Sequence, residues 1–112
     1  MLVPVSRVRI FVCRDAVDMR KSFDGLCGLV RTILNEDPLS GHVFLFTNRT
    51  RNYVKLLWWD RTGYCITAKR LARGRFGQID RAQLNTAELL QILEGMSVAT
   101  RRCSKLYEHL PE

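Results

Sequence analysis

One segment of this chain combines basic and aromatic side chains, and these are the residues best suited to binding a ligand. Nine of the eighteen lysines and arginines lie between Arg49 and Arg81. Only two acids, Asp60 and Asp80, accompany them, so the segment has a net charge of +7, equal to the formal charge of the whole protein. Five aromatic residues are interleaved with these charges: Tyr53, Trp58, Trp59, Tyr64 and Phe76. This composition is typical of a surface that binds a polyanion, because cations contact phosphates and rings stack on bases.

Strand alternation and turn positions select the candidate contacts within this segment. In residues 53–59, Val54, Leu56 and Trp58 point to one side and are expected in the core. If the strands near 7–13, 53–59 and 64–71 share one sheet, its outer face gathers Arg7, Arg9, Lys55, Trp59 and Lys69. Turn arginines reach past a sheet edge, where guanidinium groups follow a phosphate backbone or enter a minor groove. The expected nucleic-acid-binding residues are Arg49, Arg51, Lys55, Trp59, Arg61, Lys69, Arg70, Arg73 and Arg75. The competing interpretation is an ordinary basic surface whose tryptophans are buried.

Catalytic chemistry has less support in the sequence. Asp15, Asp18 and Asp24 cluster around the start of a predicted helix and could hold a metal ion for phosphoryl chemistry. Helix capping by Asp18, and ion pairing of Asp24 with Arg20 and Lys21, account for two of these acids without a metal. The sequence contains no nucleophile-elbow, P-loop or zinc-protease motif. We therefore predict a protein that is not an enzyme, with no catalytic residue, metal or cofactor.

Length and composition indicate a single domain over 1–112. Of the 112 residues, 46% are hydrophobic and 26% are charged, as in folded globular proteins. We expect a compact part over about 6–96 and a tail or short terminal helix at 97–112. Arg7 and Arg9 interrupt the region where a signal peptide needs an apolar core. No apolar run approaches the roughly 20 residues of a membrane span. These observations predict a cytoplasmic protein, associated with the nucleoid if it binds DNA.

The four cysteines form no recognisable ligand set. Cys13, Cys27, Cys65 and Cys103 are widely separated and include no C-x-x-C pair. They are expected to be reduced thiols that pack as small apolar residues.

Hydrophobic periodicity predicts the elements that position these residues. Strands are expected at 7–13, 42–47, 53–59 and 64–72, with a short edge strand at 76–79. An amphipathic helix over about 19–34 follows Asp18, its expected N-cap. A second helix covers about 86–95, with Asn85 and Glu88 arranged as a capping box. The order of strand, helix, antiparallel meander and helix predicts an α+β domain. Its mostly antiparallel sheet would have about four to five strands, with both helices packed on one face.

Several motifs, in sequence order, resemble one known family. They are 18–26 (Asp-Met-Arg-Lys-Ser-Phe-Asp-Gly-Leu), 37–46 (Asp-Pro-Leu-Ser-Gly-His-Val-Phe-Leu-Phe), 55–60 (Lys-Leu-Leu-Trp-Trp-Asp), Gly63 and 69–76 (Lys-Arg-Leu-Ala-Arg-Gly-Arg-Phe). The chain resembles the accessory protein encoded by the second open reading frame of insertion sequence 66 elements. That protein is called TnpB there and is unrelated to the RNA-guided nuclease of the same name. The resemblance spans about 8–96 and departs at 77–80, where a tryptophan-proline stretch is expected.

The resemblance implies a small protein encoded beside a DDE-type transposase and needed for efficient transposition. Its motif positions add a set of partner-contact or motif residues: Asp18, Arg20, Lys21, Asp24, Asp60 and Phe76. Asp60 is also expected to cap its own turn. Implied partners are DNA, the transposase and other element-encoded proteins, with no membrane and no small-molecule substrate.

Three functional hypotheses follow. The leading one is a non-catalytic accessory protein that binds DNA, at element ends or non-specifically, through a basic-aromatic surface at residues 49–81. The alternative is an adaptor that docks on the transposase without contacting DNA, since arginine and aromatic residues also suit protein interfaces. The third is a nuclease helper with a metal at the Asp15–Asp24 cluster. The sequence leaves the oligomeric state open.

Overall fold

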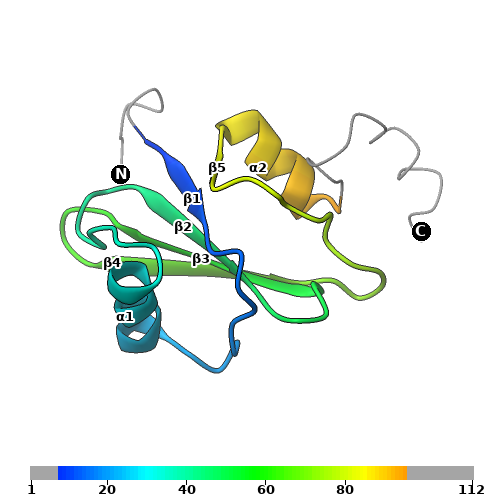
Figure 1. Ribbon diagram of the computed structural model, residues 1–112, viewed down its shortest axis with the longest axis horizontal. Coiled ribbons are helices and arrows are strands. Elements are labelled where there is room, and N and C mark those ends of the chain that lie inside the picture. Colours follow the sequence, from blue (N-terminus) through cyan, green and yellow to red (C-terminus); the bar gives the residue numbers. More distant parts are fainter. Residues whose placement is uncertain (1–7, 96–112) are drawn as a thin grey trace.

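A computed structural model describes residues 8–95, in which a five-stranded sheet carries one helix on each face (Figure 1). The elements in chain order are β1 (Ile10–Val12), α1 (Phe23–Thr32), β2 (Val43–Thr47), β3 (Tyr53–Trp59), β4 (Tyr64–Arg70), β5 (Gln83–Leu84) and α2 (Thr86–Leu93). The strands lie in the order β4-β3-β2-β1-β5. The expectations for Arg7 and for a tail at 97–112 fall outside the described residues.

The predicted α+β class with a mostly antiparallel sheet is confirmed. β2, β3 and β4 form the expected antiparallel meander, and β5 pairs antiparallel with β1. β1 and β2 are parallel, because the chain between them crosses through α1 instead of turning back in a hairpin. The carboxyl ends of β1 and β2 therefore lie at the same end of the sheet.

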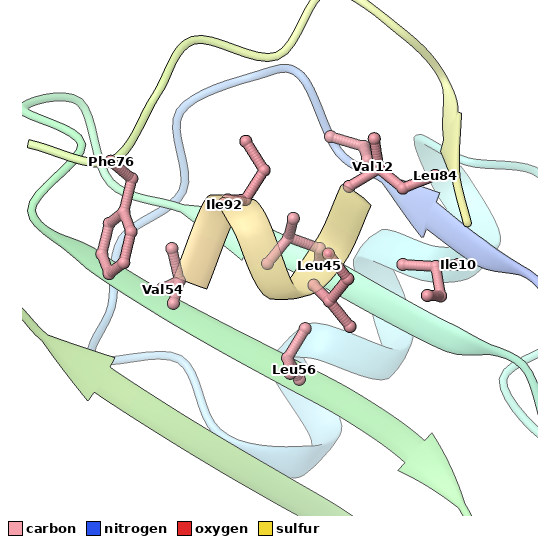
Figure 2. Packing of buried hydrophobic residues seen from close by; sticks show 9 residues of the cluster. Ile10, Val12, Leu45, Val54, Leu56, Phe76, Leu84 and Ile92 are labelled. Atoms are coloured by element: carbon pink, nitrogen blue, oxygen red, sulfur yellow. The ribbon is translucent and has the colours of Figure 1, made fainter. Parts of the chain in front are cut away.

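The expectation that both helices pack on one face is wrong. Leu89 and Ile92 of α2 pack with Ile10, Val12 and Leu45 on one face (Figure 2). On the other face, α1 packs through Leu26, Cys27 and Val30 against Phe11, Phe44 and Leu57. The reason is that the central strands are apolar on both sides: every residue of β1 is buried, as are Phe44, Leu45 and Phe46 of β2. A strand buried on both faces needs a cover on each.

Two predicted boundaries are also wrong. Asp18 does not cap α1, which begins at Phe23 after Ser22; its carboxylate instead accepts a hydrogen bond from the Arg20 backbone N–H at 2.9 Å, in a turn before the helix. Residues 76–79 do not form a strand: Phe76 turns inward and is only 1% exposed, and its N–H donates to the Arg51 carbonyl in a turn and not to a neighbouring strand. The edge strand is β5 instead.

Other local predictions are confirmed. At the start of α2, the Asn85 side chain accepts from the Glu88 N–H at 2.8 Å, and Glu88 accepts from the Asn85 N–H at 2.9 Å. This is the reciprocal capping box. Cys13 and Cys27 are free, buried thiols, as expected, and Cys65 is half-buried. Within residues 8–95, no helix is long and apolar enough to cross a membrane.

Candidate nucleic-acid interface

Six arginines gather at one end of the sheet, which we call the arginine edge: Arg14, Arg49, Arg51, Arg70, Arg73 and Arg75. Arg14 follows the end of β1, and Arg49 and Arg51 follow the parallel end of β2. Arg70, the last residue of β4, pairs with Tyr53, the first residue of β3. Figure 1 shows the β2–β3 turn and the segment after β4 at this same end. Topology therefore brings together residues from three separate parts of the chain.

The turn that carries Arg49 and Arg51 is held by two asparagines. Asn48 Oδ1 accepts from the backbone N–H groups of Asn52 and Tyr53, at 3.1 and 3.2 Å. Asn48 Nδ2 donates to Asn52 Oδ1 at 2.7 Å. Arg51 adopts a left-handed conformation with φ of 57°. This backbone is uncommon for a residue with a side chain, so the asparagine network serves to hold the arginine in a defined place.

The segment that carries Arg73 and Arg75 is tied to the same turn at both ends. The Leu71 N–H donates to the Asn52 carbonyl at 2.8 Å, and the Phe76 N–H donates to the Arg51 carbonyl at 2.6 Å. Gly74 between the two arginines has a φ of 76°, which glycine adopts without steric cost. Both arginine side chains are exposed. Backbone hydrogen bonds thus join the two arginine-bearing turns at one end of the sheet.

Arg14 and Arg70 are held by weaker contacts that leave most of their donors available. Arg14 Nη1 donates to the Asp80 carbonyl at 3.2 Å. The Arg70 guanidinium carbon lies 5.4 Å from the centroid of the Tyr53 ring, a cation–π geometry. Among residues 8–95 the two ion pairs are Arg20–Asp18 and Arg81–Glu88. Neither pair neutralises a member of the arginine edge.

A half-open pocket of about 190 Å³ lies within this edge. Its walls are the carboxyl ends of β1 and β2, the segments that follow them, and residues 77–79. The charged side chains in its lining are Arg14, Arg49 and Arg51, and no acid lines it. The pocket is therefore a concentration of positive charge with a defined shape.

Lys55 and Lys69 do not share an outer face, contrary to expectation. β3 and β4 are registered so that Lys69 pairs with Val54 and Lys55 pairs with Ala68, and directly paired residues point to the same side. Lys69 consequently faces α2, where its Nζ donates to the Leu93 carbonyl at 2.6 Å. Lys55 Nζ donates to the Lys21 carbonyl, before α1, at 2.8 Å. Each lysine ties the sheet to a different helical element.

Trp59 and Arg61 lie at the other end of the β3–β4 hairpin. Trp59 is six residues along β3 from Tyr53, which at about 3.3 Å per residue is roughly 20 Å from the arginine edge. Its ring packs edge-on against Tyr64, with centroids 5.0 Å apart. Arg61 is exposed in the following turn, with a φ of 84°. The basic-aromatic segment at 49–81 therefore does not form one contiguous face.

Asp60 caps its turn, as predicted. Its Oδ1 accepts from the N–H groups of Thr62 and Gly63 and from the Thr62 hydroxyl, at 3.0–3.1 Å. Hydrogen bonds from the Thr62 backbone, followed by those from the Cys65 thiol and the Thr62 hydroxyl, lower the pKa of the Asp60 carboxyl.

The motif before α1 is organised by an exposed ion pair. Arg20 Nη2 lies 2.7 Å from Asp18 Oδ2, and hydrogen bonds from the Arg20 side chain, and then from its backbone, lower the pKa of Asp18 to about 2. Gly25 accommodates the stem of Lys21, since a Cβ there would lie 3.2 Å from Lys21 Cβ. Asp24 is exposed in the first helical turn. These contacts give the motif a structural role at the entry to α1.

Two further candidates change in interpretation. Phe76 is buried with Val54 and Ile92 (Figure 2), so it belongs to the core and is not accessible to a partner.

Asp15, Asp18 and Asp24 do not come together: within residues 8–95, no three His, Cys, Asp or Glu side chains are grouped as metal ligands would be. The nuclease-helper hypothesis therefore has no ligand set in the described structure.

Arg14 was missed by the sequence reasoning, as were the asparagines that hold the β2–β3 turn. A usable signal existed, because Arg14 directly follows a buried strand, and ligand sites in sheets lie at the carboxyl ends of parallel strands. Recognising it required knowing that β1 and β2 are parallel neighbours.

The comparisons with known proteins agree with the motif resemblance. The profile of the IS66 Orf2 like protein family matches residues 8–103, somewhat beyond the 8–96 expected. Two Sinorhizobium fredii proteins are similar over 76 residues: y4hO at 38% identity and y4jC at 33%. Each alignment covers 68% of this chain and 66% or 65% of the relative, so the chain spans just under two thirds of the length of these relatives. No solved structure matches the chain. The family profile covers most of the sequence, and the chain therefore belongs to the IS66 Orf2-like family of insertion-sequence transposition accessory proteins.

Proposed function

We propose that this protein is a non-catalytic accessory factor of transposition that binds DNA through the arginine edge. The main support for this proposal is that six arginines from three parts of the chain gather at one end of the sheet. None of them has a carboxylate partner among residues 8–95. Arginine is suited to this role because its planar guanidinium can donate two parallel hydrogen bonds to a phosphate. The proposal narrows the contact from the whole 49–81 segment to one end of the sheet and adds Arg14.

Salt dependence is the first test. If about five edge arginines contact phosphates, the slope of log K against log salt is about −4.5, and affinity falls roughly 500-fold between about 50 and 200 mM salt. Fluorescence anisotropy of the full chain with a labelled element-end duplex, a random duplex and a single strand measures this slope. A flat salt response would refute phosphate binding.

A pair of charge-matched double variants tests the location. Arg73→Gln with Arg75→Gln removes two exposed charges from the edge and should reduce the slope by about 1.8. Arg31→Gln with Arg61→Gln removes the same charge from α1 and from the far hairpin turn, where both arginines are also exposed. This control should leave the slope unchanged. Equal losses from both doubles would show that binding follows net charge and not the arginine edge.

The adaptor alternative uses the same arginines against an acidic protein surface. It would be favoured if no DNA binds at low salt while the transposase co-purifies with this protein. In that case, the Arg73→Gln/Arg75→Gln variant should lose the transposase, and the Arg31→Gln/Arg61→Gln control should retain it.

A further inference from the structure

We infer that the pocket at the carboxyl ends of β1 and β2 binds one phosphate group, held by Arg14, Arg49 and Arg51. The phosphate chemistry stands independently, whereas the assignment of that phosphate to a DNA backbone rests on the proposed function. A phosphodiester of DNA and a free phosphate or phosphate ester present the same oxygen acceptors. The experiments below therefore separate the two sources.

Charge is the first argument. All three charged side chains in the lining are arginines, and neither Asp15 nor Asp80 is part of it. Arg14 reaches Asp80 only at the backbone carbonyl. Three arginines with no acid among the lining residues make the hollow electropositive, which favours an anion. Phosphate offers acceptors to several donors at once.

Size is the second argument. Pockets for drug-sized ligands measure about 300–1,000 Å³, so this pocket, at about 190 Å³, is below the usual size for such ligands and suits a smaller group. The pocket is therefore expected to select a phosphate group and not a base.

Preformed walls are the third argument. The Asn48–Asn52 hydrogen bonds hold the turn that presents Arg49 and Arg51. The opposite wall, 77–79, follows Phe76, which is anchored in the core. A preformed site loses little conformational entropy when it binds. Arg73 and Arg75 belong to the arginine edge but do not line the pocket.

The first experiment titrates the full chain with inorganic phosphate at fixed ionic strength, using chloride as the balancing anion, and follows arginine side-chain NMR signals. We expect saturable shifts at Arg14, Arg49 and Arg51. Arg14→Gln should weaken phosphate about tenfold, the loss expected for a hydrogen bond to a charged group. Arg73→Gln removes the same charge from the edge outside the pocket and should change affinity less than twofold. Backbone amide spectra confirm that each variant is folded.

Equal weakening by Arg14→Gln and Arg73→Gln, or shifts that never saturate, would overturn the inference, because phosphate would then be a diffuse counter-ion. Arg14→Lys supplies a further check, since it keeps the charge but loses the planar fork. It should bind phosphate more weakly than the parent and more tightly than Arg14→Gln.

The DNA arm identifies the source of the phosphate. If Arg14→Gln also lowers the salt slope of DNA binding by about 0.9, the pocket holds a backbone phosphate. If phosphate binds in the pocket but Arg14→Gln leaves DNA binding unchanged, the pocket takes a free phosphate or ester, and the assignment to DNA is wrong. If the parent binds phosphate but no DNA, the proposed function fails and the pocket stands.

Discussion

Replacing Phe76 tests whether this residue contacts a partner or stabilises the core. The motif pattern suggests a partner contact, whereas the structure buries the ring to 1% exposure beside Val54 and Ile92. Truncating a fully buried phenylalanine to alanine costs about 3–5 kcal/mol, because the transfer free energy is lost and a cavity remains. Domains of this size are stable by about 5–15 kcal/mol, so Phe76→Ala should lose a large part of the total.

Urea unfolding, followed by circular dichroism, measures this loss. Thermal unfolding gives a second measurement. At about 4–8 °C per kcal/mol, the melting temperature of Phe76→Ala should fall by at least about 12 °C. The milder Phe76→Leu keeps the experiment informative if the alanine variant does not fold, and it should be destabilised by a smaller amount. Arg75→Ala, which alters the exposed neighbour, is the control and should change stability by less than about 0.5 kcal/mol.

The role of Phe76 in the core would be refuted if Phe76→Ala cost less than about 1 kcal/mol. A folded Phe76→Ala protein of parental stability that had lost its partner would instead restore the contact role. We expect the opposite result from the burial of Phe76. Phe76→Ala should lose stability, and its DNA binding should fall only in proportion to the unfolded fraction and to any loosening of the wall at 77–79.

Three further predictions test local contacts. Asn85→Ala should lower the free energy of unfolding by about 1 kcal/mol in urea titrations, because it removes the N-cap of α2; an unchanged midpoint would contradict the capping role. Lys69→Met should slightly destabilise the protein by removing the bond to the Leu93 carbonyl, yet leave DNA affinity within twofold; a large loss of affinity would return Lys69 to the interface. The pKa of Asp18, about 2 against an ordinary 3.8, is lower in the folded state, so its stabilising contribution is present above pH 3.8 and is lost as the pH falls toward 2. Carboxyl NMR titration should show that pKa rising toward 3.8 in Arg20→Gln, and an unchanged value would refute the ion pair.

Some features followed from the sequence because their causes are local. The bounds of β3 were predicted as the structure has them, at 53–59, since a short run rich in aromatic and apolar residues between two turn signals is a strong strand signal. The capping box of α2 and the Asp60 turn involve groups only two to five residues apart. The family motifs were also readable directly from the chain.

Other features failed because they depend on neighbours distant in sequence. Tyr64 and Ile66 pack in the core beneath α1 and not in the one that holds Val54 and Leu56. The pairing of Trp59 with Tyr64 places each β4 side chain, and a shift of one residue would reverse every face. Lys55 and Lys69 were therefore assigned to one surface, although they point to opposite sides.

By itself, the sequence determined the α+β class, the family and the concentration of positive charge at 49–81. Only the tertiary structure decided which of those charges act together. The parallel pairing of β1 with β2 brings Arg14 to Arg49 and Arg51, across more than thirty residues of chain. Phe76 is buried, and residues 77–79, which follow it, line the pocket at the same edge. Which strands become neighbours, and in which direction they run, depends on contacts between residues far apart in the sequence, and a local pattern of residues does not specify those contacts.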